Sequence, residues 1–494
     1  MNPINWTVVT PEIWLLALTC VVLLADLGVR SPQRAPTFWL TQAGVLVFTL
    51  MHLRAAEGQA IAYGLGGMVV SDPMGHLLAC FAGVATMATL AYARPTLAAR
   101  DMQRGEFYTL ALTSLLGVSI MTSANHFLVV YLGLEVMSLS LYALVAMRRD
   151  HLVATEAAMK YFVLGALASG FLLYGLSMMY GATGSLEIPT VFDRIATGEI
   201  NADVLVFGLV FVVAGLAFKL GAVPFHMWVP DVYQGAPTAV TLLIAAAPKL
   251  AAFAITIRLL VEGMLGLAVD WQQMFIVLAV GSLGVGNGPA IAQTNLKRML
   301  AYSTISQVGF VLLGLSAGVV SGNTLSAGNA YSSAMFYIVT YVLTTLGSFG
   351  LIMLLSREGF ECEEIDDLAG LAQRAPWIAG VMAVIMFSLA GIPPMVGFFA
   401  KLAVLQALVA TNVGAYIGLA VFAVMMSLVG AFYYLRVVKV MYFDAPQGAA
   451  FEATRPVGAS ALLAVNGALV LLLGPLSGGL LALCRDAIVR TLAG

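Results

Sequence analysis

The chain has 494 residues, of which 61% are hydrophobic and only 10% are charged, and its formal net charge is −2. Soluble domains carry roughly 25% charged residues, so this composition excludes a soluble globular protein and indicates a polytopic membrane protein. A net charge this close to zero points to no particular partner. We expect that the chain does not bind a nucleic acid. The cysteines lack the Cys-x-x-Cys or Cys/His spacing of a metal or iron–sulfur site and stand singly at Cys20, Cys80, Cys362 and Cys484.

Apolar stretches follow one another along the whole chain, separated by short loops. A spanning helix needs about 20 mostly apolar residues, so the sequence predicts an all-α fold of about fourteen transmembrane helices. The predicted spans cover residues 11–29, 37–55, 72–93, 107–123, 126–146, 156–180, 203–220 continuing as 224–233, 237–262, 271–289, 296–319, 329–355, 376–392 continuing as 394–409, 415–441 and 457–480.

Basic residues concentrate in the loops that follow odd-numbered spans. They include Arg30, Arg34, Arg94, Arg100, Arg104, Arg148, Arg149, Lys297, Arg298, Arg357, Arg374, Arg436 and Lys439. Such residues gather on the cytoplasmic side of a membrane protein, so we expect both termini to face away from the cytoplasm. Because a missing or extra span would scramble this bias, the loops support the number of helices.

Two predicted spans contain a break with the same short sequence pattern. Span 7 is interrupted at Gly221-Ala-Val-Pro224 and span 12 at Gly391-Ile-Pro-Pro394, and proline removes a backbone donor and clashes with the preceding turn. The two breaks are five spans apart, and an odd number of spans reverses the direction in which the chain crosses the membrane. The pattern therefore indicates two inverted five-helix repeats with an ion site near the broken helices. The expected units are residues 1–106 with helices 1–3, 107–262 with the first repeat (helices 4–8), 263–443 with the second repeat (helices 9–13), and 444–494 with helix 14 and the tail.

Four of the charged residues inside the apolar spans are singled out by their depth: Glu135, Lys219, Lys249 and Lys401. A charge at membrane depth costs ~2.5 to 3.5 kcal/mol on insertion scales and marks a functional site by default. Lysine changes its protonation state readily when dry, and opening a Glu135–Lys219 pair would alter the proton affinity of the next lysine through space. These residues therefore predict a proton path. The alternative is that they hold helices together, or that the lysines extend toward an interface.

Weaker candidates lie after the first break and in span 10. His226 is either a proton relay or a structural histidine, and Tyr302 and Ser303 belong to a polar stripe that either holds water or joins helices in lipid. The acidic residues 361–367 are expected to form a solvated loop or a partner contact. Because no cluster of carboxylates and carbonyls points to sodium, the sequence favours protons, and we expect no metal site.

Three longer segments carry a family resemblance: AFKLGAVPFHMWVPDVYQGAPTAVT (217–241), LKRMLAYSTISQVGF (296–310) and LAGIPPMVGFFAKL (389–402). They resemble the antiporter-like membrane subunits of respiratory complex I, the proton-pumping NADH:quinone oxidoreductase, and the resemblance extends from about the second predicted span to the last. Among these subunits the chain is most similar to the subunit N type, the counterpart of mitochondrial NADH dehydrogenase subunit 2. The features that select this type are the loop 231–237, the lysine at position 401 and the end of the chain after span 14.

The resemblance implies a role for each buried charge. Glu135 and Lys219 would form an ion pair, Lys249 would be the central relay and Lys401 the distal proton site. It also implies a bacterial inner-membrane location, with both termini periplasmic, among lipids and the other membrane-arm subunits of complex I. The sequence has no Gly-rich turn of the Rossmann type after a strand. We therefore expect no cofactor in this chain, with NADH, FMN, iron–sulfur clusters and quinone bound by partner subunits.

Two other functions remain open at this point. A subunit of a multi-component cation/proton antiporter would share the fold and the buried charges. A passive membrane scaffold would use the same charges only to orient its helices. Loss of pumping on replacement of a buried lysine, in a complex that still assembles, would exclude the scaffold.

Overall fold

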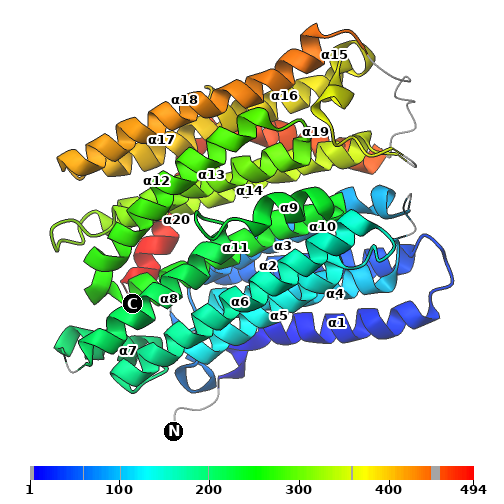
Figure 1. Ribbon diagram of the computed structural model, residues 1–494. Helices are drawn as coiled ribbons and strands as arrows, with labels where there is room; N and C mark the ends of the chain where they lie inside the picture. Colours follow the sequence, from blue (N-terminus) through cyan, green and yellow to red (C-terminus); the bar gives the residue numbers. More distant parts are fainter. Residues whose placement is uncertain are drawn as a thin grey trace.

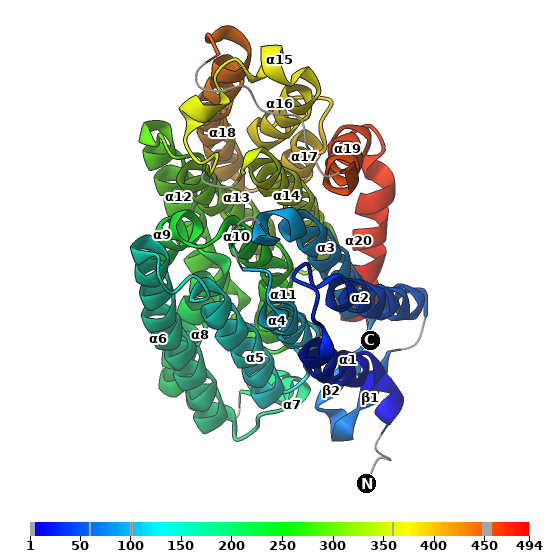
Figure 2. The same cartoon turned by 90° about the vertical axis from the view of Figure 1, so that its right-hand side faces the viewer.

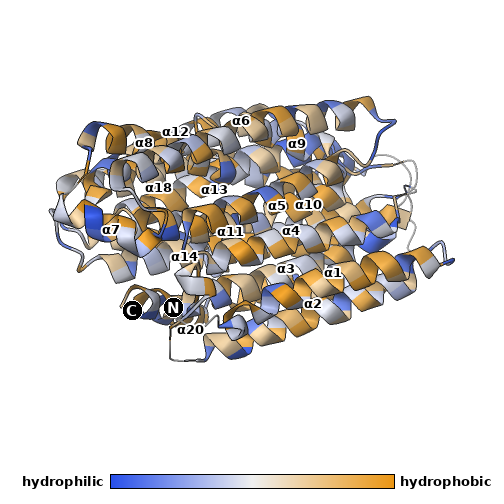
Figure 3. Cartoon of the chain, turned by 90° about the horizontal axis from the view of Figure 1, so that it is seen from below, coloured by the Kyte–Doolittle hydropathy of each residue, from blue (hydrophilic) through white to orange (hydrophobic). Residues whose placement is uncertain are grey.

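The computed structural model describes residues 5–58, 61–98, 100, 102–198, 200–357, 360–446 and 457–493. They form a bundle of long, roughly parallel helices that extends from α1 (Thr10–Gly28) at one edge to α18 (Gly414–Phe443) at the other (Figures 1 and 2). Hydrophobic residues cover the helices, and hydrophilic residues gather at helix ends and loops (Figure 3). This is the all-α architecture that the sequence predicts.

The first part of the chain packs largely in sequence order, with neighbouring helices side by side. Its elements are α2 (Ala35–Ala56), β1 (Ala62–Gly64), β2 (Val69–Ser71), α3 (Pro73–Ala98), α4 (Gly105–Ser123), α5 (Phe127–Val145), α6 (Leu152–Thr183), α7 (Ile188–Thr197), α8 (Ala202–Leu220), α9 (Trp228–Gly235), α10 (Thr238–Ala245), α11 (Ala247–Thr256) and the π-helical segment η3 (Ile257–Glu262). Helices α2 and α3, α4 and α5, and α6 and α8 form close pairs.

The second part contains α12 (Ala268–Ala292), α13 (Leu296–Ser316), α14 (Ala327–Leu355), α15 (Leu371–Arg374), α16 (Pro376–Ala390), α17 (Val396–Val409), α19 (Val457–Leu472) and α20 (Ser477–Leu492), in addition to α18. Helix α14 runs through the middle of the molecule and contacts α3, α10 and α11 on one side and α16, α17 and α19 on the other. It therefore joins the two parts of the bundle. Short 3-10 segments occupy Trp6–Val9, Leu65–Gly67, Leu265–Leu267 and Ile365–Leu368.

Every predicted span has a helical counterpart. Ten of the described helical segments are long and apolar enough to cross a membrane, and the bent pair α19–α20 would make eleven. The remaining predicted spans correspond to α2, to α4 and to the two shorter apolar helices α16 and α17, which pack within the bundle.

The structure contains both predicted helix breaks. Helix α8 ends at Leu220 and α16 ends at Ala390, and each is followed by a glycine in the left-handed region. Gly221 has a φ of 82° and Gly391 a φ of 86°, values that glycine adopts without the steric cost of a side chain. The prediction of broken helices at these two places is confirmed.

A third break, which the sequence did not predict, lies within the predicted span 237–262, although Thr238–Glu262 remains a single membrane-crossing segment. Ala246 separates α10 from α11 with a φ of −105° and a ψ of −98°. Pro248 explains the interruption, because it has no N–H to donate to the carbonyl group of Ile244 and its ring clashes with that carbonyl. Lys249 therefore sits in the first turn of α11 instead of mid-helix.

The C-terminal end also differs from the prediction of a span over 457–480. Helix α19 stops at Leu472, and α20 leaves it at an angle of 85°. Gly474 and Pro475 lie at this bend, where a proline disfavours helical conformation in the residue before it. Helix α20 then packs against α14 and α3. The β1–β2 hairpin and the surface helix α7 were not predicted either.

The loops after odd-numbered spans meet at one end of the bundle. Glu361 pairs with Arg100 at 2.9 Å and with Arg148 at 3.0 Å, while Glu363 pairs with Lys297 at 2.8 Å. Burial raises the pKa of Glu361, but the hydrogen bond with Glu363 and the nearby basic side chains outweigh it and hold that pKa at about 2. This part of the acidic segment is thus ion-paired within the chain, which corrects its interpretation as a solvated loop.

Candidate functional site

The break after α8 exposes backbone carbonyl groups that a continuing helix would have bonded. The chain turns at Gly221, where an added Cβ would lie 3.0 Å from Val229 Cγ2 and 3.4 Å from Lys249 Nζ. A glycine at this position therefore lets the amine of another span approach the end of α8.

Lys249, from α11, occupies this approach. Its side chain is 1% exposed, its Nζ donates a hydrogen bond to the Leu220 carbonyl oxygen at 2.6 Å, and it lies 5.6 Å from the centre of the Trp228 ring. Among the described residues, no carboxylate lies within the 4.0 Å that defines an ion pair with it. Its amine is held by a neutral oxygen and an aromatic face, so no anion fixes its proton.

Lys219 reaches across to α5 from the last turn of α8. Its Nζ donates to Ser138 Oγ at 2.8 Å. Glu135 lies one turn earlier on the same face of α5, close enough to interact electrostatically with Lys219. The expected Glu135–Lys219 ion pair is nevertheless open here, and the buried Oε1 of Glu135 has no hydrogen-bond partner among the described residues. Glu135, Lys219 and Lys249 thus gather around the end of one helix.

His226 lies in the same break, between α8 and α9. Its backbone carbonyl accepts from Val229 N at 2.9 Å, and its Nδ1 is buried without a hydrogen-bond partner among the described residues. His226 therefore lies in the break that follows α8, and among the described residues it has no hydrogen bond to any of the three charged residues.

The second break holds its lysine in a comparable way. Lys401 of α17 is 8% exposed, and its Nζ donates to the carbonyl oxygens of Leu389 at 2.9 Å and Ala390 at 3.0 Å, and to Ser427 Oγ at 2.7 Å. A Cβ on Gly391 would lie only 2.9 Å from Lys401 Cδ. The carbonyl groups freed at the end of α16 are again the acceptors of a buried amine.

A hydrogen-bonded network leads from Lys401 into α13 and α18. Gln307 Nε2 donates to the Leu389 carbonyl at 3.2 Å, which it shares with Lys401, and to Tyr434 Oη at 3.0 Å. Tyr434 Oη lies 2.5 Å from Ser303 Oγ. Ser303 therefore belongs to the surroundings of Lys401. Tyr302 points elsewhere, with its ring 6.0 Å from the guanidinium of Arg298.

A cavity of about 10 Å³ adjoins this network. Its lining includes Gln307, Tyr337, Ser388 and Ala400, and Tyr337 donates a hydrogen bond to Gln307 Oε1. A void needs roughly 10–15 Å³ to hold one water molecule. The space beside Gln307 thus suits a single water molecule with polar groups at hand.

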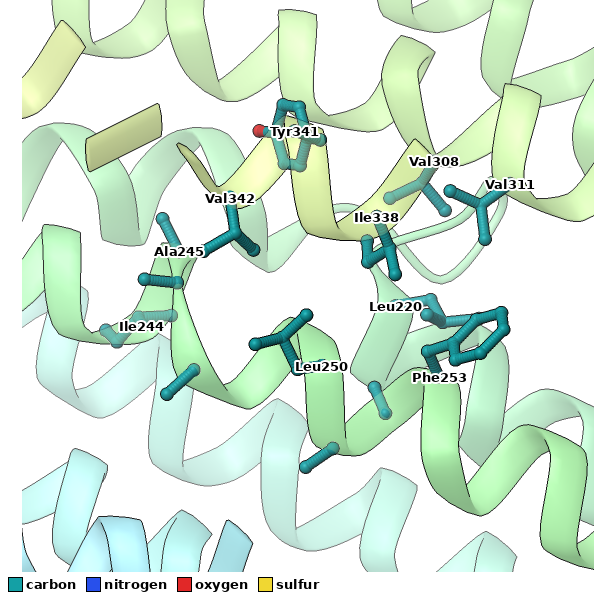
Figure 4. Close-up of a cluster of buried hydrophobic side chains, with 14 of the residues drawn as sticks. Leu220, Ile244, Ala245, Leu250, Phe253, Val308, Val311, Ile338, Tyr341 and Val342 are labelled. Atoms are coloured by element: carbon teal, nitrogen blue, oxygen red, sulfur yellow. The ribbon is translucent and has the colours of Figure 1, made fainter. Parts of the chain in front are cut away.

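A hydrophobic layer separates the two lysine-containing groups. Helix α14 contacts both α11 and α17, so it lies between Lys249 and Lys401. The buried layer consists of Leu250 and Phe253 from α11, Ile338 and Val342 from α14, and Val308 and Val311 from α13 (Figure 4). Among the described residues, no hydrogen bond links Lys249 with the network around Lys401.

Several contact residues escaped the sequence prediction. Ser138, Ser427 and Tyr434 bind the predicted lysines or their network, but each stands in an apolar span as an ordinary helix residue. The available signal was weak: Ser138 follows Glu135 by one turn, and Tyr434 is one of two consecutive tyrosines in an apolar span.

Comparison with known proteins first defines a class. Residues 124–427 match the family described as NADH:quinone oxidoreductase/Mrp antiporter, TM. A chain of respiratory complex I from Thermus thermophilus with bound aureothin aligns with a TM-score of 0.79 at 31% identity, covering 96% of this chain and 100% of that one. A chain of the Mrp complex from Dietzia sp. DQ12-45-1b, at 20% identity and a TM-score of 0.84, covers 99% and 98% and shows the common fold alone. Fold and site together define an antiporter-like membrane subunit.

Two relatives narrow this class. The NADH-quinone oxidoreductase subunit N of Polaromonas naphthalenivorans (strain CJ2) is 62% identical over 490 residues, covering 99% of this chain and 98% of that protein. The same subunit of Herminiimonas arsenicoxydans is 60% identical over 498 residues and covers 100% of both chains. The chain belongs to the NADH-quinone oxidoreductase subunit N family. The resemblance that the motifs suggested is thereby confirmed.

Proposed function

We propose that this chain moves protons across the bacterial inner membrane as a membrane-arm subunit of NADH:quinone oxidoreductase. The path includes Glu135, Lys219, Lys249 and Lys401, with His226, Tyr302 and Ser303 as further relay candidates. One observation carries the proposal: Lys249 is 1% exposed and its amine has a backbone carbonyl, not a carboxylate, as its acceptor. An unpaired amine is costly to keep in the bilayer interior, and proton exchange is a function that requires it.

The first group, which consists of Glu135, Lys219 and Lys249 around the end of α8, contains the elements of an electrostatic switch. The amine of Lys219 has Ser138 as its present acceptor and Glu135 one turn away on the same helix face. Moving from Ser138 to Glu135 would close the ion pair. Because Lys219 directly precedes Leu220, whose carbonyl holds Lys249, this movement changes the field at the next lysine. A proton on Lys249 is thereby retained or released.

The second group contains the elements of a proton wire. Lys401 connects through the Leu389 carbonyl and Gln307 to the hydroxyl groups of Tyr434 and Ser303. Hydroxyl groups accept and donate at the same atom, so Tyr434 and Ser303 can hand a proton from one to the other. The Leu389 carbonyl only accepts, from both Lys401 and Gln307, so a proton crosses between Lys401 and the hydroxyl groups through water. The single-water cavity beside Gln307 supplies a further exchange partner.

The hydrophobic layer between the groups serves as the barrier. Transfer from Lys249 to Lys401 requires water to enter between α11 and α14, and a dry layer at other times prevents a passive leak. In this proposal, entry of water into the layer couples quinone reduction to proton transfer between the two lysines. The energy comes from quinone reduction in partner subunits, where we place NADH, FMN, iron–sulfur clusters and quinone, with no cofactor in this chain.

The orientation follows from the loops. Those after odd-numbered spans meet in one ionic cluster, and their basic residues favour the cytoplasmic side. We therefore place both termini in the periplasm. A cation/proton antiporter subunit is the second candidate, but only the fold is shared with the Mrp chain at 20% identity, whereas the subunit N relatives reach 62%.

Replacement of Lys219 by Ala tests the function directly. The assembled oxidoreductase, reconstituted in vesicles, should oxidise NADH while proton uptake falls to near background. Lys439→Ala is the matched control, because Lys439 is 62% exposed and, among the described residues, pairs with Asp444 alone. It should pump as the wild type does. Intact pumping by Lys219→Ala would support a scaffold instead. A strict sodium requirement for transport would contradict protons as the transported ion.

A further inference from the structure

A pair of buried histidines lies outside the row of lysines. His52 on α2 and His76 on α3 are 2% and 8% exposed, and their Nδ1 atoms are 2.9 Å apart. Two such nitrogens at this distance need one proton between them, because one must donate and the other accept. On its other side, His76 Nε2 lies 2.7 Å from the hydroxyl oxygen of the partly exposed Ser71.

A charged triad lies beside this pair. Arg258 bonds Asp72 Oδ2 at 2.5 Å and Glu262 Oε1 at 2.8 Å, and Asp72 and Arg258 are each 1% exposed. With both acids ionised, the triad carries one more negative than positive charge. Among the described residues, the charged or titratable groups that interact electrostatically with His76 are Asp72, Arg258 and His52. One proton on the histidine pair balances the excess charge.

The triad borders a cavity of about 530 Å³ at the end of the bundle opposite the ionic loop cluster. Asp72, Arg258 and Glu262 line it together with Asn125, Asp193 and Tyr331. The Glu262 side chain keeps 18% exposure, so the cavity communicates with the surface. A charged cavity of this size admits many water molecules, and water therefore reaches the triad.

Two members of the triad, Arg258 and Glu262, belong to the same span as the central lysine, and Asp72 directly precedes α3. Arg258 follows Lys249 by nine residues, which corresponds to a rise of about 13.5 Å along a helix. At this point α11 passes into the π-helical segment Ile257–Glu262, and single π-helical turns occur frequently at functional sites. The element that holds Lys249 thus ends in the triad that faces the water-filled end.

We propose that the His52–His76 pair is a second proton-binding site, coupled to the Asp72–Arg258–Glu262 triad, that exchanges protons with water in the cavity. The proposal rests on the proposed function and gives the proton row an outlet at this end of the membrane. Uptake forms one N–H bond on the unprotonated imidazole nitrogen and converts a hydronium ion to water. Release through Ser71 reverses this step, so atoms and charge balance.

Glu262→Gln tests the electrostatic coupling without changing the shape of the side chain. It removes one of the two negative charges that offset Arg258, whose positive charge opposes a proton on His76. The pair should therefore bind its proton more weakly. The pH at which pumping is half-maximal on the alkaline side should fall by about one unit, while NADH oxidation in the assembled complex persists. An unchanged profile, or a shift to higher pH, would overturn the coupling. A residue that only packs helices would not shift this profile.

The histidines are tested by His52→Phe and His76→Phe, with Thr49→Val as the control on the same face of α2. Thr49 is buried, and within the described part of the chain its hydroxyl donates to the Val45 carbonyl alone. Each histidine variant should lower the protons pumped per NADH several-fold, and Thr49→Val should not. Unchanged pumping by both histidine variants refutes this inference. If Lys219→Ala also pumps normally, the proposed function fails as well. Should the Phe variants not assemble, the Glu262→Gln profile decides.

Discussion

The two broken helices use the same chemistry but build it from different parts of the chain. At each break a glycine with positive φ ends a helix, and a buried lysine donates into the freed carbonyl groups. At the first break the lysine comes from a neighbouring span and has one acceptor. At the second, Lys401 returns from the other half of the same broken helix and has three acceptors. The two breaks share the helix end with its free carbonyl groups. They differ in which segment of the chain supplies the lysine.

Their surroundings differ as well. The first break has a carboxylate within electrostatic range, Glu135, and an ion pair that is open. The second has the amide and hydroxyl groups of Gln307, Tyr434 and Ser303 instead. An ion pair responds strongly to a change of charge. Hydroxyl groups donate and accept at one atom, so they can pass a proton on while they themselves stay neutral. The comparison assigns switching to the first group and conduction to the second.

The largest effect is expected from removing either buried amine. Lys249→Met and Lys401→Met preserve much of the side-chain volume and remove the proton carrier. Both should abolish proton uptake driven by NADH, measured by fluorescence quenching in vesicles that contain the assembled complex. If Lys401→Met retains more than half of the pumping while Lys249→Met retains none, the second break is not an obligatory part of the path.

The glycines at the breaks come next. Gly221→Ala and Gly391→Ala each place a Cβ in the left-handed region, at a cost of ~1–2 kcal/mol. The Cβ at position 391 would also meet Lys401 Cδ at 2.9 Å, so this variant should lose more pumping. Thermal inactivation of the complex should begin at lower temperature in both variants.

Gly284→Ala supplies the glycine control. It lies inside α12, and a Cβ there meets no atom of the described residues within 4 Å outside its own helix backbone and chain neighbours. Alanine in a helix interior is favoured over glycine by ~0.5–1 kcal/mol, so its stability should be unchanged or slightly higher. If Gly284→Ala lost as much pumping as Gly221→Ala and Gly391→Ala, the result would contradict the claim that the helix breaks are specifically required for pumping.

A smaller effect is expected in the network of the second group. Tyr434→Phe removes the hydroxyl that joins Ser303 and Gln307 and should cost ~1–3 kcal/mol for the buried groups left unpaired. Pumping should slow several-fold without stopping, since Lys401 keeps its own acceptors. Tyr416→Phe is the control on the same helix, because the Ser316 carbonyl is the one acceptor of Tyr416 among the residues that the structure describes. Equal rates in the two variants would contradict a conducting role for Tyr434.

The sequence predicted the elements of this comparison but not their contacts. Gly-x-x-Pro identified both breaks because glycine and proline act through local backbone geometry. The break at Ala246 was missed because the alanines before Pro248 are strong helix formers. The bend at Gly474-Pro475 was missed because the apolar run continues across it.

The predicted buried charges could be found because membrane burial of a charge is rare. Their partners could not, since a backbone carbonyl such as that of Leu220 or Leu389 carries no sequence signal. The Glu135–Lys219 pair shows the same limit. Opposite charges in neighbouring spans suggest contact, yet the amine has Ser138 as its acceptor in this structure. Which of two nearby acceptors is used depends on packing across helices.

The smallest effect is expected outside the membrane, at the ionic loop cluster. The pKa of Glu361 is held at about 2, below its usual value of 4.5, so its ionised form stabilises the fold above pH 4.5. That contribution disappears as the pH falls from 4.5 through about 2. Glu361→Gln should therefore be less stable than the wild type near pH 7, by ~1 kcal/mol or less for a partly exposed pair, and the difference should vanish toward pH 2.

Unfolding of the solubilised complex at several pH values, followed by circular dichroism, measures this difference. Asp486→Asn is the control, because its pair with Arg490 lies on a side chain that is 60% exposed and should contribute almost nothing. Pumping should be unaffected in both variants. If Glu361→Gln instead abolished pumping with its stability intact, the loop cluster would belong to the proton path, and the division between a switching group and a conducting group would have to include a third region.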